Sequence, residues 1–562
     1  MSDGHPILRS VERQVLDRHH LDFRLLQRNT NDAIPVLLRC YGNIVRGLRT
    51  GTIPKNNDDA KSQTASEGLR GMAHCFRWIR SCCPRNVIVS SPKPDVLLAE
   101  ALDLLRWGVL YDPLYNQHTA YSREVNGKRF VEAVVDESEK IITFIPNQTP
   151  HPRFFVSQIE AKKTDDARQA TLYPDEQFAH LSRFWYQSVQ SHQAGFHFDD
   201  STIVSSGALD VAAEWLKASC LPECSDDLSL GPFTAGNLRR ILAALHVTSL
   251  FRVKLENASD QNHGTEQPVE THVLSWRRDE LNQWLHHLTN VPQGGISSIV
   301  SMLTFDEELP RVTVAHKPLI LGSDDRIFFL PRLFLDLPLS QMVVRAMNLT
   351  QTNRRHYDGT STSIEQAVVQ RIADDIRTGP LANTNIVIER TFQLPNGKKI
   401  TPDFVLRSTD ETEMLVVDVK NAIPPFGTGD VVNHLKEWSS KWQPQLSAYV
   451  DAFRSHPEIL SQHFTASACI SPRIFGLLLL RWPFPVPMDI PSDMGAIDWP
   501  TFHAYLAATP GTRSMAELHV WLRERPDCSW AGALQWRPKQ INVGDWTYRY
   551  SVLSLAGSRP IT

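Results

Sequence analysis

The sequence has no apolar run that is long enough to cross a membrane. Its strongest run, residues 475–480, has the length of a strand, whereas a membrane-spanning helix needs about 20 apolar residues. The amino terminus has no apolar segment behind a basic start, so no secretory signal is predicted. These absences predict a cytoplasmic protein that has no membrane partner.

Cysteines are few, and their spacing does not suit a metal site. Of the eight in the chain, only Cys220 and Cys224 have a metal-like spacing, and no second pair lies near them. Thiols in a cytoplasmic protein are normally reduced. The sequence therefore predicts neither a structural zinc site nor a disulfide framework.

The chain has no large excess of either charge. Its formal net charge is −4, and residues 361–484 are close to neutral on their own. This charge balance does not indicate a nucleic-acid partner, although a basic groove can lie within a neutral domain. The sequence also has no phosphate-binding P-loop, no helicase-like motif and no internal repeat. An ATPase or sensor would therefore be a separate protein partner.

The composition is that of an ordinary folded protein. The 562 residues are 42% apolar and 21% charged, and the length predicts three or four domains. Residues 1–195 and 196–350 are predicted as two α+β regions, of which the second could recognise a substrate or partner. Residues 355–485 are predicted as an α/β domain, and residues 486–562 as a carboxy-terminal α+β extension. The predicted fold class is multidomain α/β.

Local patterns predict elements throughout these regions. Helices are predicted at residues 98–107, 237–245, 278–288 and 515–525, and strands at residues 130–135, 140–145, 546–555 and twice within residues 318–330. Residues 56–67 are predicted as a polar loop, residues 345–358 as a polar connection, and the proline-rich residues 483–491 as a boundary.

Two acids are predicted to face each other on neighbouring strands. Residues 414–420 form an apolar, β-branched run after a polar turn, and residues 400–407 form the strand before that turn. Side chains alternate along a strand, so Asp418 and Lys420 share a face. If the turn is centred between residues 410 and 411, Asp403 lies opposite Asp418. A shift of one residue would place the two acids on opposite faces.

Opposed carboxylates on an apolar hairpin repel each other, so a positive charge should lie between them. Mg²⁺ or Mn²⁺ is the economical candidate, with Lys420 as a further positive charge beside it. The alternative is an ordinary salt-bridged strand pair, because an acid followed two residues later by lysine is common.

The flanking elements supply further candidate residues. Residues 364–376 have the apolar stripe of a helix, and residues 361–363 could provide its N-cap. Glu365 borders that stripe and is either an acid that stabilises the helix start or a third acid of the site. A strand at residues 386–394 and a turn at residues 395–397 follow.

A helical run follows Lys420, with a kink or restart at Pro444, and residues 473–480 form a further strand. Gln445 and Tyr449 lie four residues apart in this run, so they share one helical face. They could approach the site together, or they could form a polar end on a packed helix.

This arrangement resembles the PD-(D/E)XK nuclease superfamily, whose core is a mixed sheet flanked by helices. The matching residues are Glu365 in the first motif, Pro402-Asp403 in the second, Asp418-Val419-Lys420 in the third, and Gln445 and Tyr449 in a RecB-like Gln-x-x-x-Tyr motif. A RecB-like histidine is not evident. The resemblance covers approximately residues 355–485.

The resemblance implies phosphodiester hydrolysis with one Mg²⁺ or Mn²⁺. Asp403, Asp418 and the backbone carbonyl of Val419 would hold the metal, with Glu365 reaching it directly or through water. Lys420 would orient or deprotonate the attacking water. The predicted protein is a DNA endonuclease, and a role in prokaryotic antiphage defence or restriction follows by analogy.

The alternative is a scaffold protein that binds nucleic acid without cleaving it. Such proteins usually lose an acid or the lysine, whereas this sequence retains the full set, which favours the enzyme.

Overall fold

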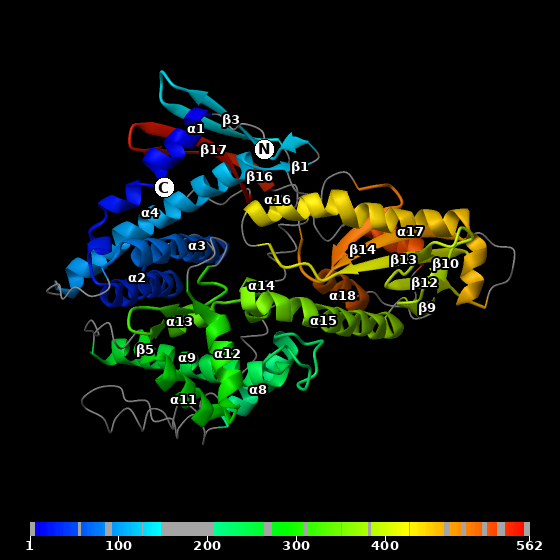
Figure 1. Cartoon of the computed structure of the whole chain (residues 1–562), viewed down its shortest axis with the longest axis horizontal. Coiled ribbons are helices and arrows are strands. Elements are labelled where there is room, and N and C mark those ends of the chain that lie inside the picture. Colours follow the sequence, from blue (N-terminus) through cyan, green and yellow to red (C-terminus); the bar gives the residue numbers. More distant parts are fainter. Residues whose placement is uncertain are drawn as a thin grey trace. The chain divides into compact units, whose positions relative to one another are not determined.

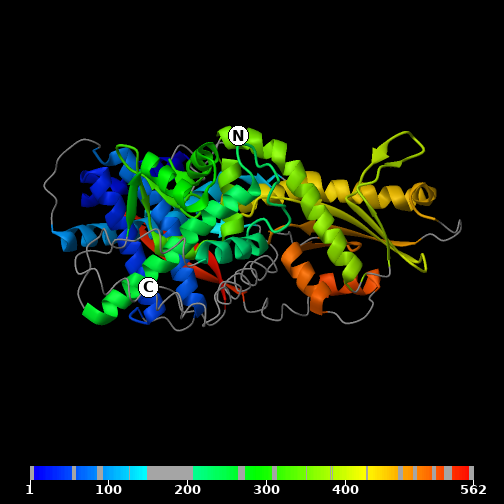
Figure 2. The same ribbon diagram turned by 90° about the horizontal axis from the view of Figure 1, so that it is seen from below.

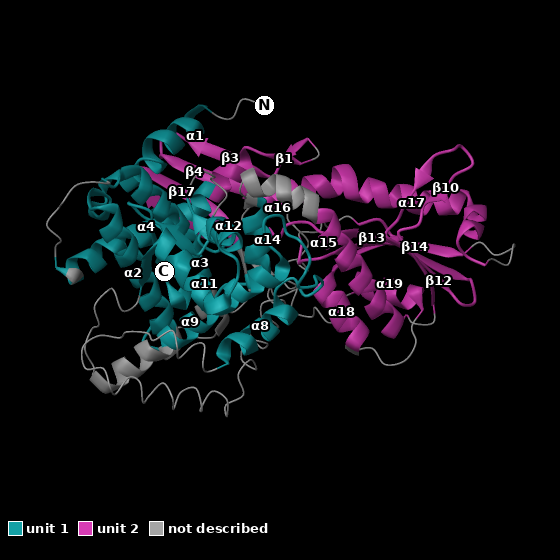
Figure 3. Cartoon of the chain, turned by 60° about the horizontal axis from the view of Figure 1, so that its bottom comes forward, with its two compact units in different colours: residues 1–115, 165–360 teal, residues 116–164, 361–562 magenta. Residues whose placement is uncertain are grey.

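The chain forms two compact units in a computed structural model (Figure 3). The first comprises residues 1–115 and 165–360, and the second comprises residues 116–164 and 361–562. The structure describes residues 6–53, 58–84, 93–125, 127–147, 207–263, 273–306, 313–349, 351–379, 381, 384–425, 428–465, 472–484, 490–508, 514–524 and 534–555. Within these residues, no helix combines the length and apolar character needed to span a membrane.

The first unit is mainly helical. Its described helices are α1 (Pro6–Val11), η1 (Glu12–Leu16), η2 (His19–Asp22), η3 (Arg24–Gln27), α2 (Thr30–Thr50), α3 (Asp58–Cys82), α4 (Pro94–Tyr121), α8 (Ala208–Ser219), α9 (Ala235–His263), α11 (Arg278–Thr289), α12 (Gln293–Leu303), α13 (Pro331–Leu335) and α14 (Leu339–Leu349). The last residues of α4 belong to the second unit. A four-stranded sheet has the order β5 (Leu274–Arg277), β8 (Arg326–Phe329), β7 (Leu319–Leu321) and β6 (Thr304–Phe305).

The second unit contains two larger sheets. One has the order β16 (Leu534–Val543), β17 (Trp546–Leu555), β4 (Ile141–Pro146) and β3 (Val131–Asp136). The other has the order β15 (Met494–Asp498), β14 (Arg473–Leu480), β13 (Glu413–Lys420), β12 (Phe404–Ser408) and β9 (Thr384–Ile388). Two short hairpins accompany them, β1 (Glu124–Val125) with β2 (Lys128–Arg129) and β10 (Phe392–Gln393) with β11 (Lys399–Ile400).

Helices cover both faces of the five-stranded sheet (Figure 1). They are α15 (Gln351–Thr378), α16 (Thr428–Glu437), the π-helix η4 (Trp438–Trp442), α17 (Gln443–Ser455), η5 (Pro457–Gln462), α18 (Trp499–Ala508) and α19 (Met515–Glu524). One core joins Met414 and Val416 of β13 to Trp438, Trp442 and Leu446. The opposite face packs against α19, where the ring of Phe475 stacks on His519. The predicted multidomain α/β class is confirmed.

The predicted strand register is also confirmed. Phe404 pairs with Val417 and Arg407 with Met414, so the turn is centred where the sequence placed it. The strand predicted at residues 400–407 is interrupted, however, because β11 ends at Ile400 and β12 begins only at Phe404. Pro402 lies in this gap and has no N–H to donate to a neighbouring strand.

The strand predicted at residues 386–394 is likewise divided into β9 and β10. Glu389 follows β9 with a φ of 46°, a left-handed conformation that ends a strand. The β10–β11 hairpin turns at Gly397, whose φ of 81° suits glycine, so the predicted turn at residues 395–397 is confirmed.

Two connections predicted as irregular are helical. Helix α3 begins at Asp58, so the polar loop predicted at residues 56–67 is wrong, because alanine, lysine, glutamine and glutamate there favour a helix. Helices α14 and α15 replace the connection predicted at residues 345–358. Residues 361–363 therefore lie inside α15, and their predicted N-cap role is wrong. The polar residues of these segments predicted exposure to solvent, but a helix at the surface is exposed just as a loop is.

Long-range pairing joins segments that the sequence had separated. Strand β4 pairs in parallel with β17, so residues 141–146 share a sheet with the carboxy-terminal part of the chain. Strand β15 lies beyond the boundary predicted at residue 485, yet it pairs with β14 and extends the five-stranded sheet. The predicted division at 195, 350 and 485 therefore differs from the two units.

Candidate active site

Asp403 and Asp418 meet where β12 begins and β13 ends. Asp403 directly precedes β12, and its Oδ2 accepts a hydrogen bond of 2.6 Å from the backbone N–H of Val419. Its carbonyl oxygen accepts a hydrogen bond of 2.9 Å from the N–H of Glu389. Asp403 thus continues the strand pairing beyond Phe404 and lies beside Asp418, as the predicted register requires.

Lys420 lies on the same face of β13 as Asp418. Its Nζ is 2.9 Å from Oδ1 and 2.8 Å from Oδ2 of Asp418. Only Oδ1 accepts with hydrogen-bond geometry, and Oδ2 is buried with no hydrogen-bond partner in the structure. Asp418 is only 2% exposed, so Lys420 and the neighbouring Asp403, rather than bulk solvent, surround its carboxyl.

Gln445 and Tyr449 extend this polar chain from α17. The amide oxygen of Gln445 accepts from Nζ of Lys420 at 3.4 Å, and its amide nitrogen donates to the Tyr449 hydroxyl at 2.8 Å. The hydroxyl oxygen of Tyr449 accepts this bond, so its proton can be donated elsewhere. Gln445 and Tyr449 therefore share one face of α17, as predicted, and this face lies beside Lys420.

The π-helix η4 precedes this pair and adjoins Pro444, where the sequence predicted a kink. Pro444 occupies the first turn of α17, where a missing N–H costs little. Trp438 and Trp442 at the ends of η4 are both buried in the core beneath the sheet. The extra residue of a π-turn changes the helical phase. The two tryptophans can therefore face the core while Gln445 faces Lys420.

Glu365 of α15 lies close to the two aspartates. It is partly buried, and burial raises the pKa of its carboxyl, while Lys420 lowers it and Asp418 and Glu389 raise it through their charges. These electrostatic interactions show that Glu365 is close to the pair on β13. The alternative role at a helix start is wrong, since α15 begins at Gln351.

The two aspartates have perturbed acidities. Burial, followed by the charge of Asp418, raises the pKa of Asp403 to about 7. Burial also raises the pKa of Asp418, and Lys420 opposes that change. If both carboxyls were ionised, two buried negative charges would share the single positive charge of Lys420.

Glu389 is an acid that the sequence interpretation missed. It is exposed, it follows β9 in a left-handed conformation, and its charge raises the pKa of Glu365. An acid at the end of an apolar strand is a visible signal. Its closeness to Glu365 is not visible, because it depends on the turn that the left-handed backbone makes.

The donors at this site suit a hard divalent cation, because carboxylate and carbonyl oxygens are the ligands that Mg²⁺ prefers. The N–H and C=O of one strand residue point to the same side. Since the N–H of Val419 points to Asp403, its carbonyl is directed to that side as well. Among the described residues, no three His, Cys, Asp or Glu side chains already form a metal-binding group. Direct coordination would therefore fall to Asp403, Asp418 and Val419, with Glu365 farther out.

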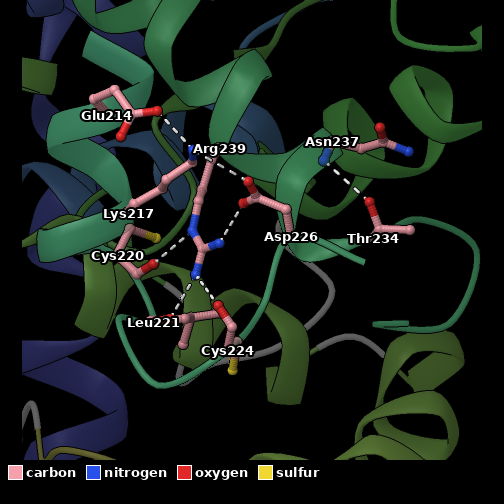
Figure 4. A network of polar contacts seen from close by, with 9 residues as sticks. All are labelled: Glu214, Lys217, Cys220, Leu221, Cys224, Asp226, Thr234, Asn237 and Arg239. Atoms are coloured by element: carbon pink, nitrogen blue, oxygen red, sulfur yellow. Dashed lines mark hydrogen bonds and ion pairs between the residues drawn. The ribbon is translucent and has the colours of Figure 1, made fainter. Parts of the chain in front are cut away.

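The cysteine pair of the first unit has a different environment (Figure 4). Arg239 donates to the carbonyl oxygens of Cys220, Leu221 and Cys224 at 3.1, 2.6 and 2.8 Å. It also donates to Asp226 at 2.6 Å. A buried guanidinium thus fixes the loop that carries both cysteines.

Comparisons with known proteins identify no relative: no protein-family model, curated protein or solved structure matches this chain.

Proposed function

We propose that this chain is a metal-dependent nuclease of PD-(D/E)XK type that hydrolyses phosphodiester bonds in DNA as an endonuclease. The observation that carries the proposal is the pair of adjacent buried carboxyls, Asp403 and Asp418, with the Lys420 ammonium 2.8 Å from Asp418. Two adjacent buried carboxylates are costly when both are ionised, so they are kept where a cation compensates them. A cytoplasmic setting in prokaryotic defence or restriction belongs to the proposal.

Asp403, Asp418 and the carbonyl of Val419 would hold Mg²⁺ or Mn²⁺, with Glu365 contributing through water. When bound, the cation supplies positive charge at the scissile phosphate and lowers the pKa of water. The acids contribute by their fixed positions on neighbouring strands, which need no rearrangement before the reaction.

Lys420 stabilises the negative charge that develops on the phosphate. An ammonium has three donors. In the structure one reaches Asp418 and another reaches Gln445, which leaves the third for a phosphate oxygen or the attacking water. Gln445 positions the ammonium group, and the Tyr449 hydroxyl can donate to a neighbouring phosphate oxygen.

The overall step is the hydrolysis of one phosphodiester bond. The water oxygen forms a bond to phosphorus while the bond between phosphorus and the leaving oxygen breaks. The water loses a proton to solvent through the polar groups of the site, and the leaving oxygen gains one.

Cleavage of supercoiled plasmid, linear duplex, single-stranded DNA and RNA in Mg²⁺, Mn²⁺ or EDTA tests the proposal. Metal-dependent nicking of the plasmid by the wild type, lost in Asp418→Asn and Lys420→Ala, is the expected result. Asp451→Asn is a matched control, because Asp451 also lies in this unit but its side chain is 71% exposed.

Failure to cleave any substrate, together with no metal binding by calorimetry, would refute the proposed nuclease activity. It would favour the scaffold that binds nucleic acid without cleaving it. Metal binding to the wild type but not to Asp418→Asn would instead support a nuclease that needs a partner, such as a separate ATPase or sensor, for activity.

A further inference from the structure

The β10–β11 hairpin begins and ends at the candidate site. We define the basic hairpin as residues 390–401, which connect Glu389 to Pro402 and Asp403. At its base, the N–H of Glu389 donates to the carbonyl of Asp403 at 2.9 Å, and the hydroxyls of Thr391 and Thr401 are 3.0 Å apart. Figure 2 shows this yellow-green hairpin projecting from the five-stranded sheet. Its position is therefore tied to one of the proposed metal ligands.

The basic hairpin is held firmly to the rest of the domain. Phe392 is fully buried and meets Phe453 and His463 edge to face, with ring centroids 4.9 and 4.8 Å apart. The side chain of Gln462 accepts from the N–H of Gln393 at 2.9 Å and donates to its carbonyl at 2.8 Å. A segment fixed in this way loses little conformational entropy when it binds a ligand.

Three of its exposed side chains are cationic. Arg390, Lys398 and Lys399 are exposed, whereas the apolar side chains of Phe392 and Ile400 point into the core. No ion pair involves these three cations in the part of the chain that the structure describes.

Some cations of the same unit do have carboxylate partners, in contrast to these three. Arg407 pairs with Glu411 at 3.0 Å, and Arg454 pairs with Asp493 at 2.7 Å. The outward cations of the basic hairpin are thus available to an external polyanion.

We infer that the basic hairpin binds the phosphate backbone of DNA beside the cleavage site. This inference rests on the proposed function and adds the surface that positions the substrate. Lys398 is five residues from Asp403, so the two lie at most about 17 Å apart at about 3.4 Å per residue. That reach corresponds to roughly five base pairs of B-DNA. The contacts are to phosphates, so they favour no particular sequence.

The test measures binding of a duplex of about 30 base pairs by fluorescence anisotropy over a range of salt concentrations. The protein is the full chain with Asp418→Asn, which prevents cleavage, with and without Lys398→Ala and Lys399→Ala. Loss of two phosphate contacts should weaken binding by on the order of tenfold and reduce the slope of log Kd against log salt by about two. A control pair, Lys93→Ala with Lys539→Ala, removes the same charge from residues that belong neither to the basic hairpin nor to the five-stranded sheet.

A second arm separates the basic hairpin from the catalytic groups. With Asp418 restored, Lys398→Ala with Lys399→Ala should raise KM for duplex DNA and leave kcat nearly unchanged. Hydrolysis of bis(p-nitrophenyl) phosphate should also be unchanged, because this small diester has no flanking phosphates.

Three outcomes are distinguishable. The expected losses, absent from the control pair, support the inference. If the wild type binds and cleaves DNA while the hairpin variants match the control pair, the inference is wrong and the proposed function stands. If the wild type neither binds DNA nor hydrolyses either substrate, both are overturned.

Discussion

Two buried charges in this chain have opposite surroundings. The Arg239 side chain is 4% exposed, and it donates to three backbone carbonyls and to Asp226. The Asp418 side chain is 3% exposed, and one of its oxygens has no hydrogen-bond partner while a second acid lies beside it. The first charge has four hydrogen-bond acceptors within the fold, whereas the second has the ammonium of Lys420 on one side and a neighbouring acid on the other.

The difference distinguishes a buried charge that stabilises the fold from one that is better explained by a chemical role. A buried charge with a full set of partners is strongly destabilising to remove, because its partners then lose their hydrogen bonds. Burial raises the pKa of Asp418 despite Lys420, so its ionised form costs stability, and replacing it by a neutral group of the same shape should cost little or even stabilise. Function is the reason to retain it.

The largest expected effect is the loss of catalysis in Asp418→Asn. We expect the single-turnover cleavage rate to fall about 10³-fold, which corresponds to about 4 kcal/mol of activation free energy. The free energy of unfolding in EDTA should stay the same or rise by about 1 kcal/mol, because the amide removes a repelled charge. A variant that loses several kcal/mol of stability in urea denaturation would show that Asp418 is mainly structural.

Arg239→Met should show the reverse pattern. We expect the free energy of unfolding to fall by about 3–5 kcal/mol, because three carbonyls and Asp226 lose their donor. The neighbouring exposed Arg240→Met should change it by less than about 0.5 kcal/mol. Equal effects of the two variants in urea denaturation would contradict the role of Arg239 in fixing its loop.

The third prediction concerns pH. The pKa of Asp403 is raised to about 7 in the fold, against about 3.9 in an unfolded chain. Between these values the folded state holds the proton and the unfolded state has lost it, so without metal this group makes stability fall as pH rises. Below about pH 4 both states are protonated and the effect disappears.

Asp403→Asn isolates this contribution from the other titrating groups. The difference in unfolding free energy between wild type and variant should change by about 3 kcal/mol between pH 4.5 and 7.5, given about 1.4 kcal/mol per pKa unit. Saturating Mg²⁺ should stabilise the wild type more at pH 7.5 than at pH 5. Parallel curves for wild type and variant would refute the raised pKa.

The smallest expected effect is at Glu389, where backbone and side chain can be separated. Glycine adopts the left-handed conformation without strain, so Glu389→Gly should stabilise the fold by up to about 1 kcal/mol. Cleavage should fall by about tenfold in both Glu389→Gly and Glu389→Gln, because the Glu389 carboxylate adds negative charge that attracts the cation to the site. Unchanged cleavage in both variants would show that Glu389 serves only to form the turn after β9.

Local patterns were sufficient for much of the sheet that carries the candidate site. The alternation of residues 414–420 and the polar turn before them predicted the pairing of Phe404 with Val417. Asp418 and Lys420 fell on one face for the same reason. Residues 473–480 and 546–555 form strands with the predicted bounds.

Other features were hidden because polarity alone does not separate an exposed helix from a loop. Helix α3 begins within a predicted loop, and α15 continues through a predicted cap. The breaks at Glu389 and Pro402 divide two predicted strands, so the basic hairpin between them is a separate element.

The sequence by itself determined which residues can share a face and where the hairpin between β12 and β13 turns, because these depend on the two-residue period of a strand and on nearby turn residues. The tertiary structure alone decided that β17 pairs with β4, that β15 extends the sheet, and that Glu365, Glu389 and Gln445 come close to the acids on β12 and β13. Such contacts between distant segments depend on how the whole chain buries its apolar surface, which no local pattern encodes.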